Sequence, residues 1–135
     1  MAEAKVSLEV CESEFERFAE AMGLEFDPTT MGEDDKKSLS AAKDRLFKAM
    51  QAGSLVIDES GRAVFTPQMG DKSPITFNEP MGSSLMAMDQ KKKDHDVAKM
   101  FAFMADSTKQ PPSRFAAMAN RDLKVCQSIT MLFLG

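Results

Sequence analysis

The sequence has few of the residues that most often carry catalysis or bind metal ions. Its 135 residues include one histidine and two cysteines, and neither tryptophan nor tyrosine. His95 lies in "DHD", but adjacent side chains point apart, and no second histidine or cysteine stands at a metal-ligand spacing from it. Cys11 and Cys126 lack C-x-x-C spacing, which favours reduced thiols over a disulfide. We therefore expect no metal site and no cofactor.

The acidic residues also form no catalytic constellation. Glu79, Asp89, Asp106 and Asp122 lie at predicted helix ends, where a carboxylate caps the helix or interacts with its dipole more often than it catalyses. The turn "MGSS" follows a predicted strand, as in phosphate-binding loops, but it lacks the lysine and the second glycine that make that motif specific. We expect that the protein is not an enzyme.

Long apolar runs are missing as well. Stretches such as "MFAFMA" fall far short of the roughly 20 residues that a membrane-spanning helix needs. The beginning, "MAEAKVSLEV", lacks the basic head and the apolar run of a secretory signal. We therefore expect a protein that stays in the cytoplasm where it is made and has no membrane partner.

Basic side chains are outnumbered by acidic ones, 17 to 21, and most of them are scattered. The formal net charge is −4, and the first fifty residues hold seven basic and twelve acidic side chains. The one basic cluster, Lys91 to Lys93, is followed at once by Asp94 and Asp96. Because duplex binding relies on clustered lysine and arginine side chains that neutralise phosphates, this distribution argues against a nucleic-acid surface.

Apolar residues at helical spacing predict a helical hairpin at the N-terminus. The first helix is predicted over 13–22, because Ser13 and Glu16 have the spacing of a capping box and a glycine follows the last apolar residue. The second helix is predicted from about Glu33, with acidic residues in its first turn, to Gly53.

The period then changes to that of short strands. "LVI" and "AVF" stand on either side of "DESG", a turn in which Gly61 can adopt positive φ, and "PITFN" supplies a third strand. The intervening "QMGDKS" is predicted to be an exposed loop. Three short strands are not stable alone in water, so we expect helices to cover one face of the sheet.

The C-terminal part is helical again. Ser83 or Ser84 is predicted to cap a helix that runs through about Lys92, and a regular apolar stripe over 97–105 predicts the next one. The loop "DSTKQPPS" follows, because adjacent prolines remove backbone donors.

Two further helices complete the predicted order. Ser113 is expected to cap a short helix that contains Phe115, and Asp122 is expected to cap or continue a final helix whose Val125 and Ile129 face inward. Together, the elements predict an α+β fold in one domain, 1–135. Its parts are a helical hairpin (1–53), a small three-stranded antiparallel sheet (54–79) and a C-terminal bundle of three to four helices (80–135).

Methionine is abundant, with twelve residues. Its flexible, polarisable side chain fills gaps in cores and also forms adaptable surfaces for varied partners. The methionines that share a face with other apolar residues are expected in the core: Met100, Met104, Met118 and Met131. Met81, Met86 and Met88 cannot all face inward, since Met86 lies about 160° from Met88 around a helix. We take these three as candidate partner-binding residues, and Met104 as a further candidate.

A resemblance to a known family covers about 74–135. The strand ending in "EP", the helix "SSLMAMD", the helix "VAKMFAFMADST" and the closing segment "RDLKVCQSITMLFLG" resemble the tail assembly chaperones of long-tailed bacteriophages. The positions that carry the resemblance are Glu79, Pro80, Leu85, Asp89, Thr108, Arg121, Asp122, Phe133 and Leu134. Apart from the resemblance, the change from strand to helix spacing after Pro80 predicts that Glu79 and Pro80 form a structural elbow, and Asp122 is predicted as a helix cap.

The resemblance implies a non-enzymatic protein of the host cytoplasm that coats the tape measure protein during virion assembly. It also implies that the protein helps to recruit tail tube subunits, tends to self-associate, and is absent from the mature virion. In the family, a ribosomal frameshift often extends the product.

Two other functions remain open at this point. A head-to-tail connector or tail terminator would be a permanent part of the particle, and its subunits would close into a ring without a client. A host-directed regulator would use the acidic N-terminal hairpin as its interaction surface.

Overall fold

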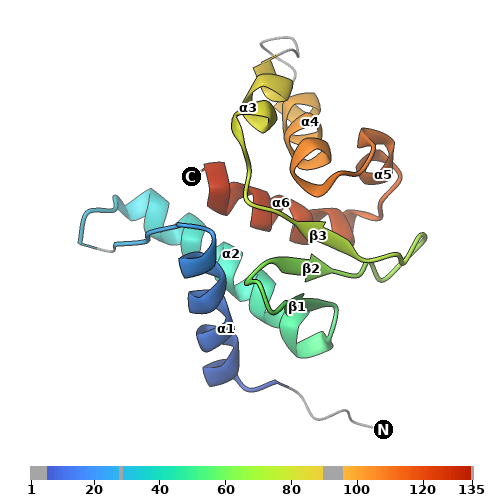
Figure 1. The fold of residues 1–135 in the computed structure, drawn as a ribbon. Coiled ribbons are helices and arrows are strands. Elements are labelled where there is room, and N and C mark those ends of the chain that lie inside the picture. The colour runs from blue at the N-terminus through green and yellow to red at the C-terminus, as the bar shows by residue number, and fades with distance from the viewer. Residues whose placement is uncertain (1–5, 28, 90–95, 135) are drawn as a thin grey trace, which may run out of the picture.

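The computed structural model describes residues 6–27, 29–89 and 96–134, and these form an α+β fold. The elements of the N-terminal part and the sheet are α1 (Leu8–Ala21), α2 (Glu33–Ala52), β1 (Leu55–Ile57), β2 (Ala63–Phe65) and β3 (Ile75–Phe77). Those of the C-terminal part are α3 (Gly82–Asp89), α4 (Asp96–Thr108), α5 (Pro112–Ala116) and α6 (Asn120–Leu134). In Figure 1, the sheet lies between α1 on one side and α6, α4 and α3 on the other.

The N-terminal hairpin is confirmed, but α1 begins earlier than predicted. Its N-cap is Ser7, whose Oγ accepts a hydrogen bond of 3.2 Å from the backbone N–H of Val10. Ser13, the predicted cap, is an exposed residue inside the helix. For α2, the prediction is confirmed at both ends, and Gly53 closes the helix in the left-handed conformation with φ of 85°.

The sheet has the predicted strands and turn. β2 is the central strand, antiparallel to both neighbours, and Phe65 stands opposite Leu55 on one side and Ile75 on the other. The first and last residue of every strand are buried, as the alternation of a half-covered sheet requires. Gly61 has a φ of 84° in the turn between β1 and β2, as predicted.

The C-terminal helices differ from the predictions mainly at their starts. α5 begins after Pro111, so Ser113 lies within the helix and does not cap it. α6 begins at Asn120, two residues before the predicted cap. Its inward residues Val125 and Ile129 are buried as expected. The predicted extension of α3 to Lys92, and His95 with it, lie outside the described residues.

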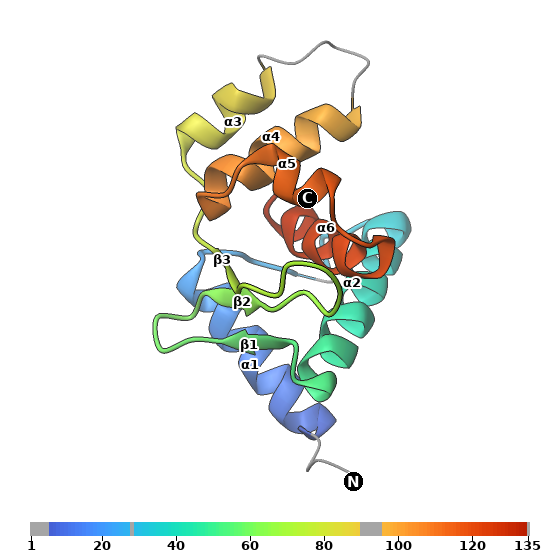
Figure 2. The same cartoon turned by 90° about the vertical axis from the view of Figure 1, so that its right-hand side faces the viewer.

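One hydrophobic core joins the two ends of the chain. α6 packs against α2, and Figure 2 shows these two helices side by side. The rings of Phe18 in α1 and Phe133 in α6 lie 5.8 Å apart between centroids, at an edge-to-face angle of 69°. Arg45 of α2 donates a hydrogen bond of 3.1 Å to Ser128 Oγ of α6. Every helix except α3 contributes at least one residue to this core.

Candidate partner-binding surface

The connection from β3 to α3 is held to the end of α4 by Asn78. Both its backbone N–H and its side-chain Nδ2 donate to the carbonyl oxygen of Ser107, at 3.2 and 2.9 Å. Arg62 in turn donates to Asn78 Oδ1 at 3.3 Å. Glu79 and Pro80 lie in the connection where the elbow was predicted, but Glu79 is exposed. The hydrogen bonds that fix the elbow therefore come from the residue before them.

Two serines attach α3 to α4. Ser83 Oγ and Ser84 Oγ both donate to Asp106 Oδ2 of α4, at 2.9 and 2.7 Å. Ser84 is buried, whereas sequence reasoning considered it only as a cap. The hydrogen bonds from Ser84 and Ser83 hold the pKa of the Asp106 carboxyl below its ordinary value, and the positive charge of Lys109 acts in the same direction. We refer to Ser83, Ser84 and Asp106 as the α3 latch.

The latch fixes which side of α3 is exposed. With Ser84 turned toward α4, Met81, Leu85 and Met86 are left 69%, 52% and 65% exposed. Met88 is half-buried. The prediction that this helix cannot bury all of its methionines is therefore confirmed. We refer to Met81, Leu85 and Met86 as the α3 surface.

The other predicted methionines divide between the core and the surface. Met104 has no exposed area and lies in the core, so it is inaccessible to a partner and its candidacy as a binding residue was wrong. Met100 and Met118 pack partly buried against the core. Met131 was expected in the core but is 48% exposed on α6. The side of α6 that faces the core is therefore narrower than the number of apolar residues in this helix suggests.

Asp122 has a role that the sequence does not show. Its side chain is buried in the first turn of α6, and its two carboxylate oxygens accept from the backbone N–H groups of Gln68 and Met69, at 3.0 and 3.1 Å. The predicted role as a cap of its own helix is wrong. Asp122 instead satisfies two donors of the loop between β2 and β3, and so ties this loop to α6.

A groove lies between α1 and α2, and the sequence did not predict it. This groove has a volume of about 890 Å³, and both helices and the loop that joins them contribute to it. Aromatic and aliphatic side chains form its floor: Phe15, Leu24, Phe26, Met31, Leu39 and Phe47. Mostly acidic side chains form its rim: Glu12, Glu16, Glu20, Glu25, Asp44, Lys36 and Lys43. We refer to it as the hairpin groove.

Titratable groups in the described part of the chain do not gather as a metal site or an activated nucleophile would require. No cluster of three or more metal-ligating side chains occurs within 6–27, 29–89 and 96–134. Both cysteines are free and buried, and burial raises the pKa of the Cys126 thiol to about 12. Such a thiol is protonated at neutral pH and therefore is a poor nucleophile.

No helix within 6–27, 29–89 and 96–134 is long and apolar enough to cross a membrane.

Comparisons of the chain with protein-family models, with curated protein sequences and with solved structures find no match.

Proposed function

We propose that this protein is a tail assembly chaperone of a long-tailed bacteriophage. In this role it binds the tape measure protein in the host cytoplasm, helps to recruit tail tube subunits, catalyses no reaction and does not remain in the finished virion. The observation that carries the proposal is the α3 surface, on which Met81, Leu85 and Met86 are exposed together. The sequence resemblance over 74–135 supplies the class of client.

The α3 surface has the physical properties that such a client requires. A tape measure rod presents many different apolar turns in succession, so its chaperone must bind each one weakly and tolerate changes of shape. Methionine does this because its unbranched side chain adapts to different neighbours. Burying one such side chain contributes roughly 1.5–3 kcal/mol, so covering three of them supports reversible binding after the entropic costs of association.

The proposal is tested with two measurements on the full chain. A pull-down should recover segments of the tape measure protein, and mass spectrometry should not detect the chain in purified virions. If the chain instead binds no tape measure segment and is present in virions, a head-to-tail connector or tail terminator replaces the chaperone. A closed ring formed by the purified chain alone would support the same replacement.

A further inference from the structure

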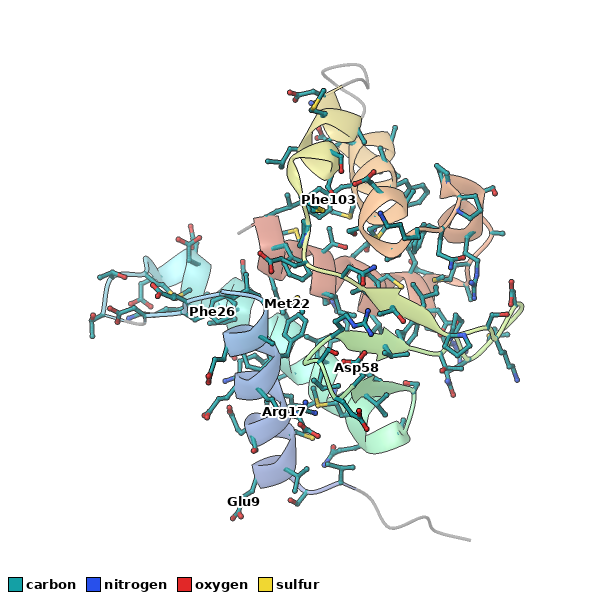
Figure 3. The ribbon with its side chains drawn as sticks, viewed as in Figure 1. Glu9, Arg17, Met22, Phe26, Asp58 and Phe103 are labelled. Atoms are coloured by element: carbon teal, nitrogen blue, oxygen red, sulfur yellow. The ribbon has the colours of Figure 1, made fainter. Side chains whose placement is uncertain are left out.

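The floor of the hairpin groove has a buried part and a half-buried part. Phe15 and Phe47 are buried. The other floor residues are half-buried: Leu24, Phe26, Met31 and Leu39. Phe26, in the loop after α1, stacks on Phe15 with centroids 5.8 Å apart and an angle of 29° between the rings. Phe47 of α2 meets the edge of Phe15 at 6.1 Å. Figure 3 shows Phe26 beside α2, on the part of the hairpin that reaches away from the sheet. A groove between two helices with such a floor suits the apolar face of a third helix.

The rim of the groove carries an excess of negative charge. Glu12, Glu16 and Glu20 follow one another at i, i+4 spacing on α1, which places their side chains in one row. Of these, Glu12 forms an ion pair with Lys43 at 3.0 Å. Glu16 and Glu20 have no side-chain hydrogen bond or ion pair within the described residues, and the same is true of Glu25 and Asp44. Like charges at this spacing repel, and a positively charged partner would relieve the repulsion.

Lys43 shows what kind of group the hairpin groove accepts. Its Nζ lies 5.2 Å from the ring centroid of Phe15 and 5.7 Å from that of Phe47, while it also pairs with Glu12. One ammonium group is therefore held between the acidic rim and the aromatic floor, where both interactions favour a cation. Further along the same rim, Glu16 and Glu20 have no such partner in the part of the chain that the structure describes.

We propose that the hairpin groove binds a basic amphipathic helix of a partner protein. The apolar face of that helix lies on the half-buried part of the floor, and lysine or arginine side chains at i, i+4 spacing face Glu16 and Glu20. Charge complementarity selects this occupant, because an acidic helix would meet an unpaired acidic row. The inference does not depend on the proposed function, since it concerns a different surface from α3.

The test uses the full chain and three labelled peptides of about 18 residues, which is about five helical turns. One has an apolar face and a lysine face, one has the same apolar face and a glutamate face, and one keeps the lysines but replaces the apolar face with glutamine and serine. Fluorescence anisotropy is expected to show binding of the first peptide only, with an affinity that falls as salt is raised.

Two pairs of variants assign the binding to the groove. Glu16→Gln with Glu20→Gln is expected to weaken binding of the basic amphipathic peptide roughly three- to tenfold, as expected for the loss of two exposed ion pairs. Glu59→Gln with Glu79→Gln makes the same change in net charge at exposed positions outside the groove and should have little effect. Glu16→Lys with Glu20→Lys should reverse the preference, so that the acidic peptide binds and the basic one does not.

Several results would overturn the inference. If the basic and acidic amphipathic peptides bind equally well, the acidic rim does not select the partner. If the control pair Glu59→Gln with Glu79→Gln weakens binding as much as the groove pair does, the effect comes from the net charge of the protein and not from the groove. Sedimentation that shows a dimer of the chain, abolished by Glu16→Lys with Glu20→Lys, would assign the groove to a second copy. Met86→Lys should leave peptide binding unchanged, so failure here is separable from failure of the tape measure proposal.

Discussion

Asp122 shows how one buried carboxylate can connect distant parts of the chain. It stands in α6, and the two N–H groups that it accepts from belong to Gln68 and Met69, more than fifty residues earlier. A loop without regular structure must satisfy its backbone donors outside a helix or a sheet, and here a side chain of another element does so. The consequence is that the loop and the start of α6 are held as one unit.

Asp122→Ala is expected to destabilise the protein by roughly 2–4 kcal/mol, because hydrogen bonds to a charged acceptor are lost and two donors lose their partner. This is more than the loss of a simple helix cap. Urea unfolding measures it, with Asp44→Ala as a control at an exposed acidic position that should change stability by less than about 0.5 kcal/mol. Asp122→Asn keeps one acceptor oxygen, so its loss of stability should lie between that of Asp122→Ala and that of Asp44→Ala. A change as small as the control's would contradict the assigned contacts.

The contrast between two methionines tests the α3 surface. Met86→Lys should change the free energy of unfolding by less than about 0.5 kcal/mol, because the side chain is largely exposed, but should weaken capture of the tape measure protein. Met104→Ala should cost about 2–5 kcal/mol, because it leaves a cavity in the core. Thermal unfolding and the pull-down measure the two effects. A large loss of stability with Met86→Lys would place that residue in the core.

For single residues, helical periodicity predicts which side chains a short helix leaves exposed, but it does not predict specific long-range partners. The exposure of Met86 follows from its position opposite the buried side of α3. The contacts of Asp122 do not, since nothing in the order of residues indicates that a loop fifty positions earlier needs acceptors. Buried acidic residues of this kind are therefore read from sequence as local caps.

Among the helices, α3 is distinguished by its attachment. It packs on α4 and contributes no residue to the hydrophobic core, and the α3 latch supplies its polar contacts. Regions with few buried apolar contacts open at a lower free-energy cost than the core does. The helix that carries the proposed binding surface is thus also the one with the least apolar anchoring.

The α3 latch should depend on pH. The pKa of Asp106 is lower in the folded state than its unfolded value, so the latch contributes fully above that value, about 4, and its contribution is lost as the pH falls through the folded-state pKa. Hydrogen-exchange protection factors of the α3 amides are expected to fall in that acidic range before those of α6. Asp106→Asn should remove most of this dependence. An unchanged pH profile in that variant would contradict the latch.

The turn between β1 and β2 packs tightly against α1. Arg17 of α1 donates to the carbonyl oxygens of Asp58 and Ile57, at 2.6 and 2.8 Å. A Cβ added to Gly61 would lie 2.3 Å from the Cβ of Ala21, so the glycine is needed for the close approach as well as for its positive φ. The turn therefore fixes the distance between the sheet and α1.

Gly61→Ala is expected to cost roughly 2–4 kcal/mol, since the left-handed conformation costs about 1–2 kcal/mol and the clash with α1 adds to it. Gly70→Ala is the matched control. Gly70 also has positive φ, at 71°, but an added Cβ would meet nothing within 4 Å. The control should show the conformational cost alone, and equal losses in urea unfolding would mean that the clash is relieved without cost.

Most elements could be predicted because their apolar spacing is regular, whereas the first residues of α1, α5 and α6 could not. Ser7 and Ser13 can both accept a bond from a helix N-terminus, and only Ser13 is followed by glutamate at the capping-box distance. The structure uses Ser7. Likewise, proline precedes Ser113 and already has the backbone conformation of a helix start, so the serine is not needed as a cap.

The whole molecule is expected to protect both thiols until it unfolds. Cys11 and Cys126 have no exposed area, and the raised pKa of Cys126 keeps its thiol protonated. A thiol reagent at pH 8 should therefore label neither residue in the folded protein, and labelling in urea should follow the loss of helical circular dichroism. Rapid labelling of Cys126 while the helical signal is native would reveal local opening of α6.

The hairpin groove could not be predicted from the sequence, although both of its helices were. It depends on the distance between α1 and α2, which is set by Phe15 and Phe47, thirty-two positions apart, and by Phe26 in the loop. The acidic excess of the first fifty residues is visible in the sequence, but charge alone does not show that four half-buried apolar side chains lie beneath it: Leu24, Phe26, Met31 and Leu39. Such a site can be recognised only when the tertiary structure is known.

The packing of α6 against α2 also constrains how the chain can mature on the ribosome. The partners of α2 and Phe18 lie in α6, which is synthesised after both N-terminal helices, so these helices leave the exit tunnel before those apolar contacts can form. Stable tertiary structure must wait until translation of α6 is complete. Until that moment, the residues of α1 and α2 that later pack against α6 are open to contacts with other molecules.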